Sequence, residues 1–130
     1  MKEKQNQMVK TARVTGIWYL CLAVFGILGF MVLHSKIYIS SDPEKTLANL
    51  TEFETISRLR LLFELLIVLS QALAALWFYK LFRSISEWEA WAVGVWGTVN
   101  AVVIMISAIS MAAAIQIAGS SVQALDDKIL

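Results

Sequence analysis

Three long apolar stretches dominate the pattern of hydrophobic and polar positions along the chain. Residues 14–33 and 90–118 contain no charged side chain, and residues 61–82 contain only Glu64 and Lys80. Each stretch reaches the ~20 residues that an α-helix needs to cross the ~30 Å hydrocarbon core of a bilayer. Because lipid offers the backbone no hydrogen-bond partner, each stretch is expected to be one continuous helix. The pattern predicts an all-α integral membrane protein with three transmembrane helices.

The polar segment 34–60, between the first and second spans, carries the signal for a further short helix. In "SSDPEK", Ser41 or Asp42 suits the N-cap and Pro43 the first turn, while Glu44 favours the positive end of the helix dipole. Apolar residues then recur at every third position: Leu47, Leu50, Phe53 and Ile56. This pattern predicts a short amphipathic helix on the outer membrane surface. A polar loop with incidental leucines is the alternative, because the periodic run is short.

Polar segments at both ends complete the predicted organisation. Residues 1–13 form a basic N-terminal tail, residues 14–118 one three-span domain, and residues 119–130 a polar C-terminal tail. The basic tail is also typical of a signal peptide, but the first apolar stretch is longer than usual and "MVLHSKIYISS" lacks an A-x-A-like cleavage site. The first span is therefore expected to remain in the protein.

Composition agrees with a membrane location. Hydrophobic residues make up 58% of the chain and charged residues 16%, against roughly 45–50% and about 25% in soluble domains. The formal net charge is +1, and no basic stripe with interleaved aromatic residues is present to bind phosphates. The expected partner is the lipid bilayer, and nucleic acid is not expected.

Charge and aromatic residues predict how the chain is threaded. Six cations flank the side of the N-terminus and the "RSISEWE" turn: Lys2, Lys4, Lys10, Arg13, Lys80 and Arg83. Five cations flank the other side: Lys36, Lys45, Arg58, Arg60 and Lys128. One aromatic pair from each span falls at the first side: Trp18 and Tyr19, Trp77 and Tyr79, Trp88 and Trp91. By the positive-inside rule and the preference of aromatic rings for headgroups, we expect a cytoplasmic N-terminus in a plasma or bacterial inner membrane. Scattered core aromatics are the alternative.

Two polar residues stand out within the second span. Glu64 lies about three residues, or ~4.5 Å, below the outer boundary, and Arg60 is four residues earlier on the same helix face. An intramembrane carboxylate is a candidate proton or cation site. A structural ion pair at the membrane interface is the preferred interpretation, since the depth is shallow and a partner is at hand.

Gln71 is deeper, about 15 Å from the outer boundary, and Asn100 is equally central in the third span. An unpaired amide in hydrocarbon costs several kcal/mol, roughly 2–7, so the sequence predicts a hydrogen bond between Gln71 and Asn100. A seam of small and polar residues at coiled-coil spacing is also predicted in the third span. It comprises Gly97, Asn100, Ile104, Ser107, Met111 and Ala114.

No pattern in the sequence points to catalysis. His34 and Cys21 are each solitary, whereas a metal site needs clustered ligands. No Ser, His and Asp arrangement and no Gly-rich phosphate loop is present. No catalytic residue, cofactor or metal is expected, and the candidate polar residues of the membrane region are Arg60, Glu64, Gln71, Asn100 and Ser107.

Four segments in this order carry a family resemblance: "ARVTGIWYLCLAVFGILGF", the acidic outer helix, "ISRLRLLFELL" and "LWFYKLFRSI". The chain resembles, from Ala12 to Ala118, the N-terminal half of a bacterial membrane-protein family known as domain of unknown function 4386. The resemblance implies a multi-span helical bundle, of about six helices in the family, and carries over no catalytic residue.

Two classes of function are compatible with these patterns. The first is a non-enzymatic membrane protein that assembles with itself or with another membrane protein, because three helices leave apolar faces uncovered. The second is a component of a small transporter or channel, in which Glu64, Gln71 and Asn100 line a polar path. A membrane enzyme is a third hypothesis without support from particular residues.

Overall fold

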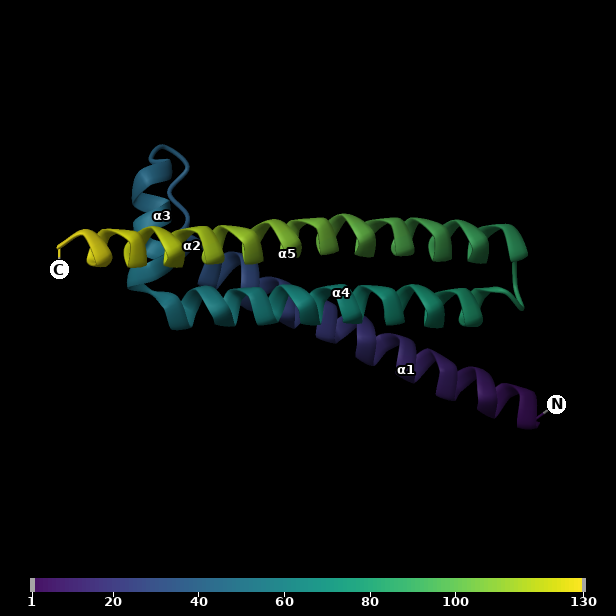
Figure 1. Ribbon diagram of the computed structural model, residues 1–130. Coiled ribbons are helices and arrows are strands. Elements are labelled where there is room, and N and C mark those ends of the chain that lie inside the picture. The colour runs from purple at the N-terminus through teal and green to yellow at the C-terminus, as the bar shows by residue number, and fades with distance from the viewer. Residues whose placement is uncertain (1, 130) are drawn as a thin grey trace.

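The computed structural model describes the backbone of residues 2–129 and the side chains of residues 2–121. Every regular element in this range is helical (Figure 1), in the order α1 (Lys2–Gly26), η1 (Ile27–Leu33), α2 (His34–Ile37), α3 (Pro43–Glu52), α4 (Glu54–Phe82) and α5 (Glu87–Ile129). Three continuous helical stretches are long and apolar enough to cross a membrane: Lys2–Ile37, Glu54–Phe82 and Glu87–Ser121. The all-α membrane architecture predicted from the sequence is confirmed.

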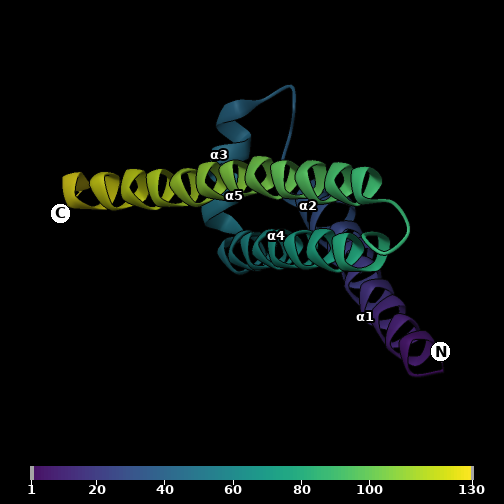
Figure 2. The same cartoon turned by 90° about the vertical axis from the view of Figure 1, so that its right-hand side faces the viewer.

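Helices α4 and α5 form an antiparallel hairpin joined by the short turn 83–86 (Figures 1 and 2). A seam of buried or half-buried residues runs along α5 with alternating steps of four and three, and consists of Ala90, Gly94, Gly97, Ala101, Ile104, Ala108, Met111, Ile115 and Ala118. Such spacing keeps one face of a helix against its neighbour. Mostly small side chains let the two backbones approach closely, and a Cβ added to Gly97 would lie 2.6 Å from the Cβ of Ala75.

The predicted seam of α5 is partly wrong. Gly97, Ile104 and Met111 do belong to it, but the buried positions between them are Ala101 and Ala108, one residue after Asn100 and Ser107. One residue corresponds to a rotation of about 100° around a helix. Where the two backbones are in close contact, only small side chains fit between them. The alanines therefore lie in the interface, and the polar side chains lie along its border.

The first span crosses α4 obliquely (Figure 1) and contains a π-helical segment, η1, that the sequence does not predict. Gly29 in this segment is buried against α4, and a Cβ there would lie 3.3 Å from the Cβ of Phe63. A π-helix closes its hydrogen bonds over five residues and so changes the register of the residues that follow. The residues after η1, beginning with His34, therefore face α4 differently than they would in a regular α-helix.

The short helix α3 is confirmed, with the predicted start. Asp42 is the N-cap, its Oδ1 accepts a hydrogen bond of 2.9 Å from the Lys45 backbone N–H, and Pro43 opens the helix. Figure 1 shows α3 roughly perpendicular to α5, the orientation of a helix parallel to the membrane plane. Leu50 of α3 packs with Ile37 and Ala118 in a small apolar core.

The helices extend beyond the predicted segments. Helix α1 begins at Lys2 within the basic tail, and α5 continues through the polar segment 119–130 as far as Ile129. A polar helix end outside the hydrocarbon is compatible with span three, since its backbone hydrogen bonds form within the helix itself. The boundaries at residues 13 and 118 therefore mark changes of composition, and the helices run through them.

Candidate functional site

A buried ion pair forms the centre of the candidate site. Arg60 and Glu64, one turn apart on α4, are only 4% and 1% exposed. Nη1 of Arg60 donates to Oε2 of Glu64 at 2.6 Å. The ion pair predicted from their spacing is confirmed. Protein from three helical segments covers the pair.

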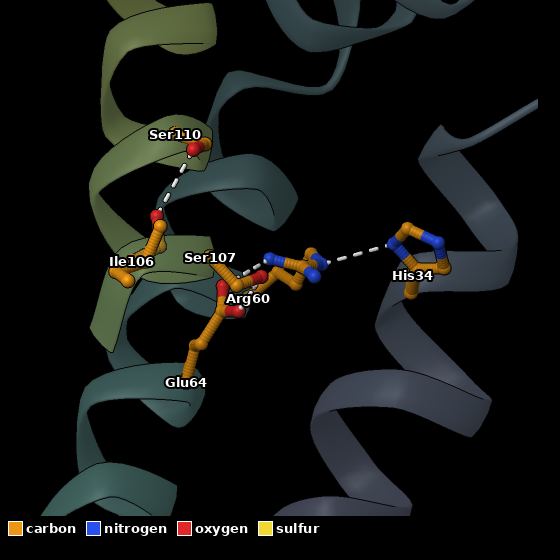
Figure 3. Close-up of polar contacts among 6 residues, drawn as sticks. All are labelled: His34, Arg60, Glu64, Ile106, Ser107 and Ser110. Atoms are coloured by element: carbon orange, nitrogen blue, oxygen red, sulfur yellow. Dashed lines mark hydrogen bonds and ion pairs between the residues drawn. The ribbon is translucent and has the colours of Figure 1, made fainter. Parts of the chain in front are cut away.

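Two further side chains complete the cluster and come from different spans. Ser107 of α5 donates its hydroxyl hydrogen to Oε1 of Glu64 at 2.6 Å. Nε of Arg60 donates to Nδ1 of His34 at 3.1 Å, which makes Nδ1 the unprotonated ring nitrogen. Figure 3 shows the Arg60 guanidinium between the Glu64 carboxylate and the His34 ring. We call these four residues the polar cluster; it ties all three spans together.

Two aromatic rings border the cluster on the side of the first span. The Arg60 guanidinium carbon lies 5.2 Å from the centroid of the Phe30 ring, within the range of a cation–π contact. The ring of Tyr38 stacks on His34 with a centroid distance of 4.8 Å. Among the side chains that the structure describes, every buried nitrogen and oxygen has a hydrogen-bond partner. The cluster is thus closed by its own partners, as a structural clamp requires.

The polar cluster has the chemistry of a helix clamp. Both carboxylate oxygens of Glu64 accept hydrogen bonds, and a buried carboxylate held in this way stays fixed in place. In the described part of the chain, no three His, Cys, Asp or Glu side chains gather closely enough to hold a metal ion. The arrangement holds the three spans together in the part of the bundle that lies away from the turn 83–86.

Gln71, near the middle of α4, does not have the partner predicted for it. Its Nε2 donates at 3.3 Å to the backbone carbonyl of Gly97 on α5, and Asn100 takes no part in the bond. The predicted contact between α4 and α5 at this depth exists, but the acceptor is the backbone. The absence of a side chain at Gly97 brings that carbonyl within reach of the amide.

Asn100 is exposed on α5, and the hydrogen bonds among the described side chains include none from its amide. It borders an open groove of about 470 Å³ whose floor is α4 and whose walls are α1 and α5. Tyr19 and Leu22 line the groove from α1, and Trp96 lines it from α5. Glu64 does not line this groove. We call it the Asn100 groove.

His34 is the member of the polar cluster that the sequence did not reveal. It is the single histidine of the chain and lies 26 positions from Arg60. No spacing rule joins residues so far apart, and the π-helical segment before His34 changes the direction in which it points. The one available signal is weak: a histidine and an arginine that both lie near the outer ends of predicted spans.

Comparison with known proteins identifies one family. Residues 14–129 match the profile of the family described as domain of unknown function (DUF4386). No curated protein and no solved structure matches the chain. The family description names no activity, so any function must be argued from the geometry of the chain.

Proposed function

We propose that this chain, which belongs to the DUF4386 family of domains of unknown function, is a non-enzymatic membrane protein that acts by assembly with a second copy of itself. The observation that carries the proposal is the exposed amide of Asn100. The buried charges are paired with each other within the polar cluster, and the Gln71 amide donates to the Gly97 carbonyl. Near the middle of the spans, these contacts leave the Asn100 side chain without a partner.

The position of Asn100 makes a missing partner costly. It lies ten residues after Ala90, where the uncharged stretch begins, or about 15 Å along the helix, and this is near the centre of a ~30 Å hydrocarbon layer. An amide without a hydrogen bond in such surroundings costs roughly 2–7 kcal/mol. A polar side chain from another transmembrane helix removes this cost.

A second copy is the occupant that the chemistry favours. An asparagine amide is both donor and acceptor, so two Asn100 side chains related by a two-fold axis along the membrane normal pair with each other. In such a dimer one surface meets its own copy. The same face of α5 carries Val103, Ser107 and Ser110, all exposed. Most of these side chains are small, which suits close packing of two membrane helices.

Dilution in liposomes tests the assembly. Donor- and acceptor-labelled copies of the wild type should show energy transfer that falls as lipid is added, and Asn100→Leu should weaken association. Interhelical polar contacts in membranes contribute about 0.6–2 kcal/mol, which is about three- to thirtyfold in the dissociation constant. The matched control is Thr98→Val on the opposite face, whose hydroxyl already bonds to the Gly94 carbonyl at 2.8 Å; it should associate normally.

Two outcomes of this experiment would contradict the proposal. A wild type that stays monomeric at every lipid ratio would exclude self-assembly. An Asn100→Leu variant that associates like the wild type would show that another face carries the contact.

The alternative of a transporter or channel component has less support. A polar path needs Glu64, Gln71 and Asn100 to line one passage, but Glu64 is 1% exposed and bonded at both oxygens. Gln71 and Asn100 share the Asn100 groove, which opens sideways. Reaction of aqueous thiol reagents with cysteines placed at both amides would favour the path over packing.

For location we propose the bacterial inner membrane with the N-terminus in the cytoplasm. Six cations lie at the end of the bundle that holds the N-terminus and the turn 83–86, and the positive-inside rule assigns that end to the cytoplasm. A reporter fused after Leu130 should therefore be active only outside; activity in the cytoplasm would reverse the threading.

A further inference from the structure

A basic groove lies between the N-terminal part of α1 and the C-terminal end of α4. It consists of two adjoining hollows of about 520 and 250 Å³ that share Gln7, Thr11 and Lys80. Lys4 and Ser84 line the larger hollow, and Lys10 lines the smaller one. The groove thus brings three ammonium groups together with amide and hydroxyl groups, all able to donate hydrogen bonds.

No carboxylate lines the basic groove. Among the side chains that the structure describes, the ion pairs are Glu54 with Arg58 and Glu64 with Arg60, both near the other end of the bundle. Lys4, Lys10 and Lys80 therefore have no acidic partner within the described chain, and their charge is available to an anion from outside.

The residues that border the groove are of the types found at the level of the lipid headgroups. Trp77 borders it, and the Lys80 ammonium is 4.5 Å from the centroid of the Trp77 ring. Tryptophan prefers the boundary between headgroups and hydrocarbon. Beside the lysines, the groove has an apolar wall that includes Met8, Leu81 and Val14. A ligand that fits has an anionic head next to an apolar body.

We propose that the basic groove binds an anionic phospholipid, with the phosphate held by Lys4, Lys10 and Lys80 and an acyl chain along the apolar wall. Basic residues between helices at the membrane surface recognise anionic headgroups in this way. Free phosphate would satisfy the lysines and leave the apolar wall bare, so the lipid is the better match. All the residues come from one chain, and the site does not depend on self-assembly.

The opposite end of the bundle supplies an internal comparison. A groove of about 520 Å³, the volume of the larger basic hollow, lies there between α3, α4 and α5 and is lined by Glu54, Arg58, Gln116 and Ser120. Its one cation, Arg58, is already paired with Glu54. The larger basic hollow and this groove are equal in volume, but only the basic groove has cations without an acidic partner, so only the basic groove should prefer an anionic lipid.

Native mass spectrometry of the full chain, released from an uncharged detergent, tests the proposal. The probes are phosphatidylglycerol and phosphatidylcholine at equal concentration. Each lysine near an anionic lipid is worth about fivefold in affinity. The wild type should bind phosphatidylglycerol at least tenfold more tightly than phosphatidylcholine. The variant Lys4→Gln/Lys10→Gln/Lys80→Gln should lose this preference.

A variant with the same change of charge at the opposite end is the matched control. Lys36→Gln/Lys45→Gln/Arg58→Gln should keep the preference for phosphatidylglycerol. All the lysines concerned are exposed, so both variants should keep the wild-type circular dichroism. If the triple lysine variant does not, Lys80→Gln alone takes its place and should lower the preference for phosphatidylglycerol about fivefold.

Three results would overturn the proposal. The first is a preference for phosphatidylglycerol that survives loss of the three lysines, or of Lys80 where that variant replaces them. The second is equal loss in the opposite-end control, which would show a general effect of net charge. The third is displacement of bound phosphatidylglycerol by inorganic phosphate at equal concentration, which would make free phosphate the ligand.

Discussion

Replacement of Glu64 by glutamine should destabilise the protein strongly. Glutamine keeps the shape of the side chain but removes its charge, and Arg60, 4% exposed, then becomes a buried cation without a counter-ion. Breaking a buried ion pair by removing one partner costs about 3–5 kcal/mol. Since the glutamine oxygen still accepts a hydrogen bond, the expected loss is near the lower end, about 3 kcal/mol.

A second variant separates the cost of leaving Arg60 without a counter-ion from the cost of losing the contacts of the ion pair. In Arg60→Met/Glu64→Leu both charges are absent, and apolar side chains of similar size fill the space. Exchanging a buried pair for well-packed apolar residues is often neutral, so the double variant should be more stable than Glu64→Gln. His34 and Ser107 each lose a partner, but Ser107 lies at the exposed border of α5.

Equilibrium unfolding in mixed detergent micelles, followed by circular dichroism, measures these differences. The control is Glu54→Gln, which breaks the pair with Arg58 at the same four-residue spacing. Its side chains are 59% and 71% exposed, and an exposed pair contributes about 0–1 kcal/mol. If Glu64→Gln costs no more than Glu54→Gln, the polar cluster does not clamp the spans, and the interfacial ion pair expected from the sequence would be the better description.

Three further predictions follow from the helix contacts. Gly97→Ala should destabilise the α4–α5 hairpin by about 1–3 kcal/mol, because the new Cβ would lie 2.6 Å from a side chain of α4. Gly94→Ala is the control: the nearest atom to its new Cβ lies at 3.5 Å, so this variant should be near neutral in the same unfolding assay. Gln71→Leu and Asn100→Leu should have strictly additive effects on the stability of the monomer, since no hydrogen bond joins them; a coupling above ~0.5 kcal/mol would restore the amide pair expected from the sequence. Asp42→Ala should remove the N-cap of α3 and cost about 1 kcal/mol, seen as faster amide exchange confined to α3; unchanged exchange would show that the cap is dispensable.

The features predicted correctly from the sequence are those that depend on nearby residues. Span length and hydropathy are local properties, and they identify all three membrane helices. The Asp42 cap depends on residues three positions apart, and the Arg60–Glu64 pair on residues four positions apart. Helix geometry alone brings each of these pairs together.

The features that the sequence did not predict depend on how helices are rotated about their axes. The position of Gln71 along its span correctly predicts that it meets α5 near Gly97 and Asn100. This position does not determine which face of α5 is turned toward α4. Ala101, one residue after Asn100 and so about 100° away around the helix, faces α4 in its place, and Gln71 donates to the Gly97 carbonyl. The π-helical segment before His34 has the same effect on the first span, which is why the polar cluster was only partly predicted.

Cysteine cross-linking in membranes at two adjacent positions tests the proposed assembly most directly. Val103 and Val102 are the same residue type and similarly exposed, 58% and 55%, but they face about 100° apart on α5, with Val103 on the Asn100 side. In a Cys21→Ser background, which removes the natural cysteine, Val103→Cys should form a disulfide-linked dimer under mild oxidation and Val102→Cys should stay monomeric. Equal cross-linking at both positions, or cross-linking at Val102 alone, would contradict assembly of two copies through the face that carries Asn100.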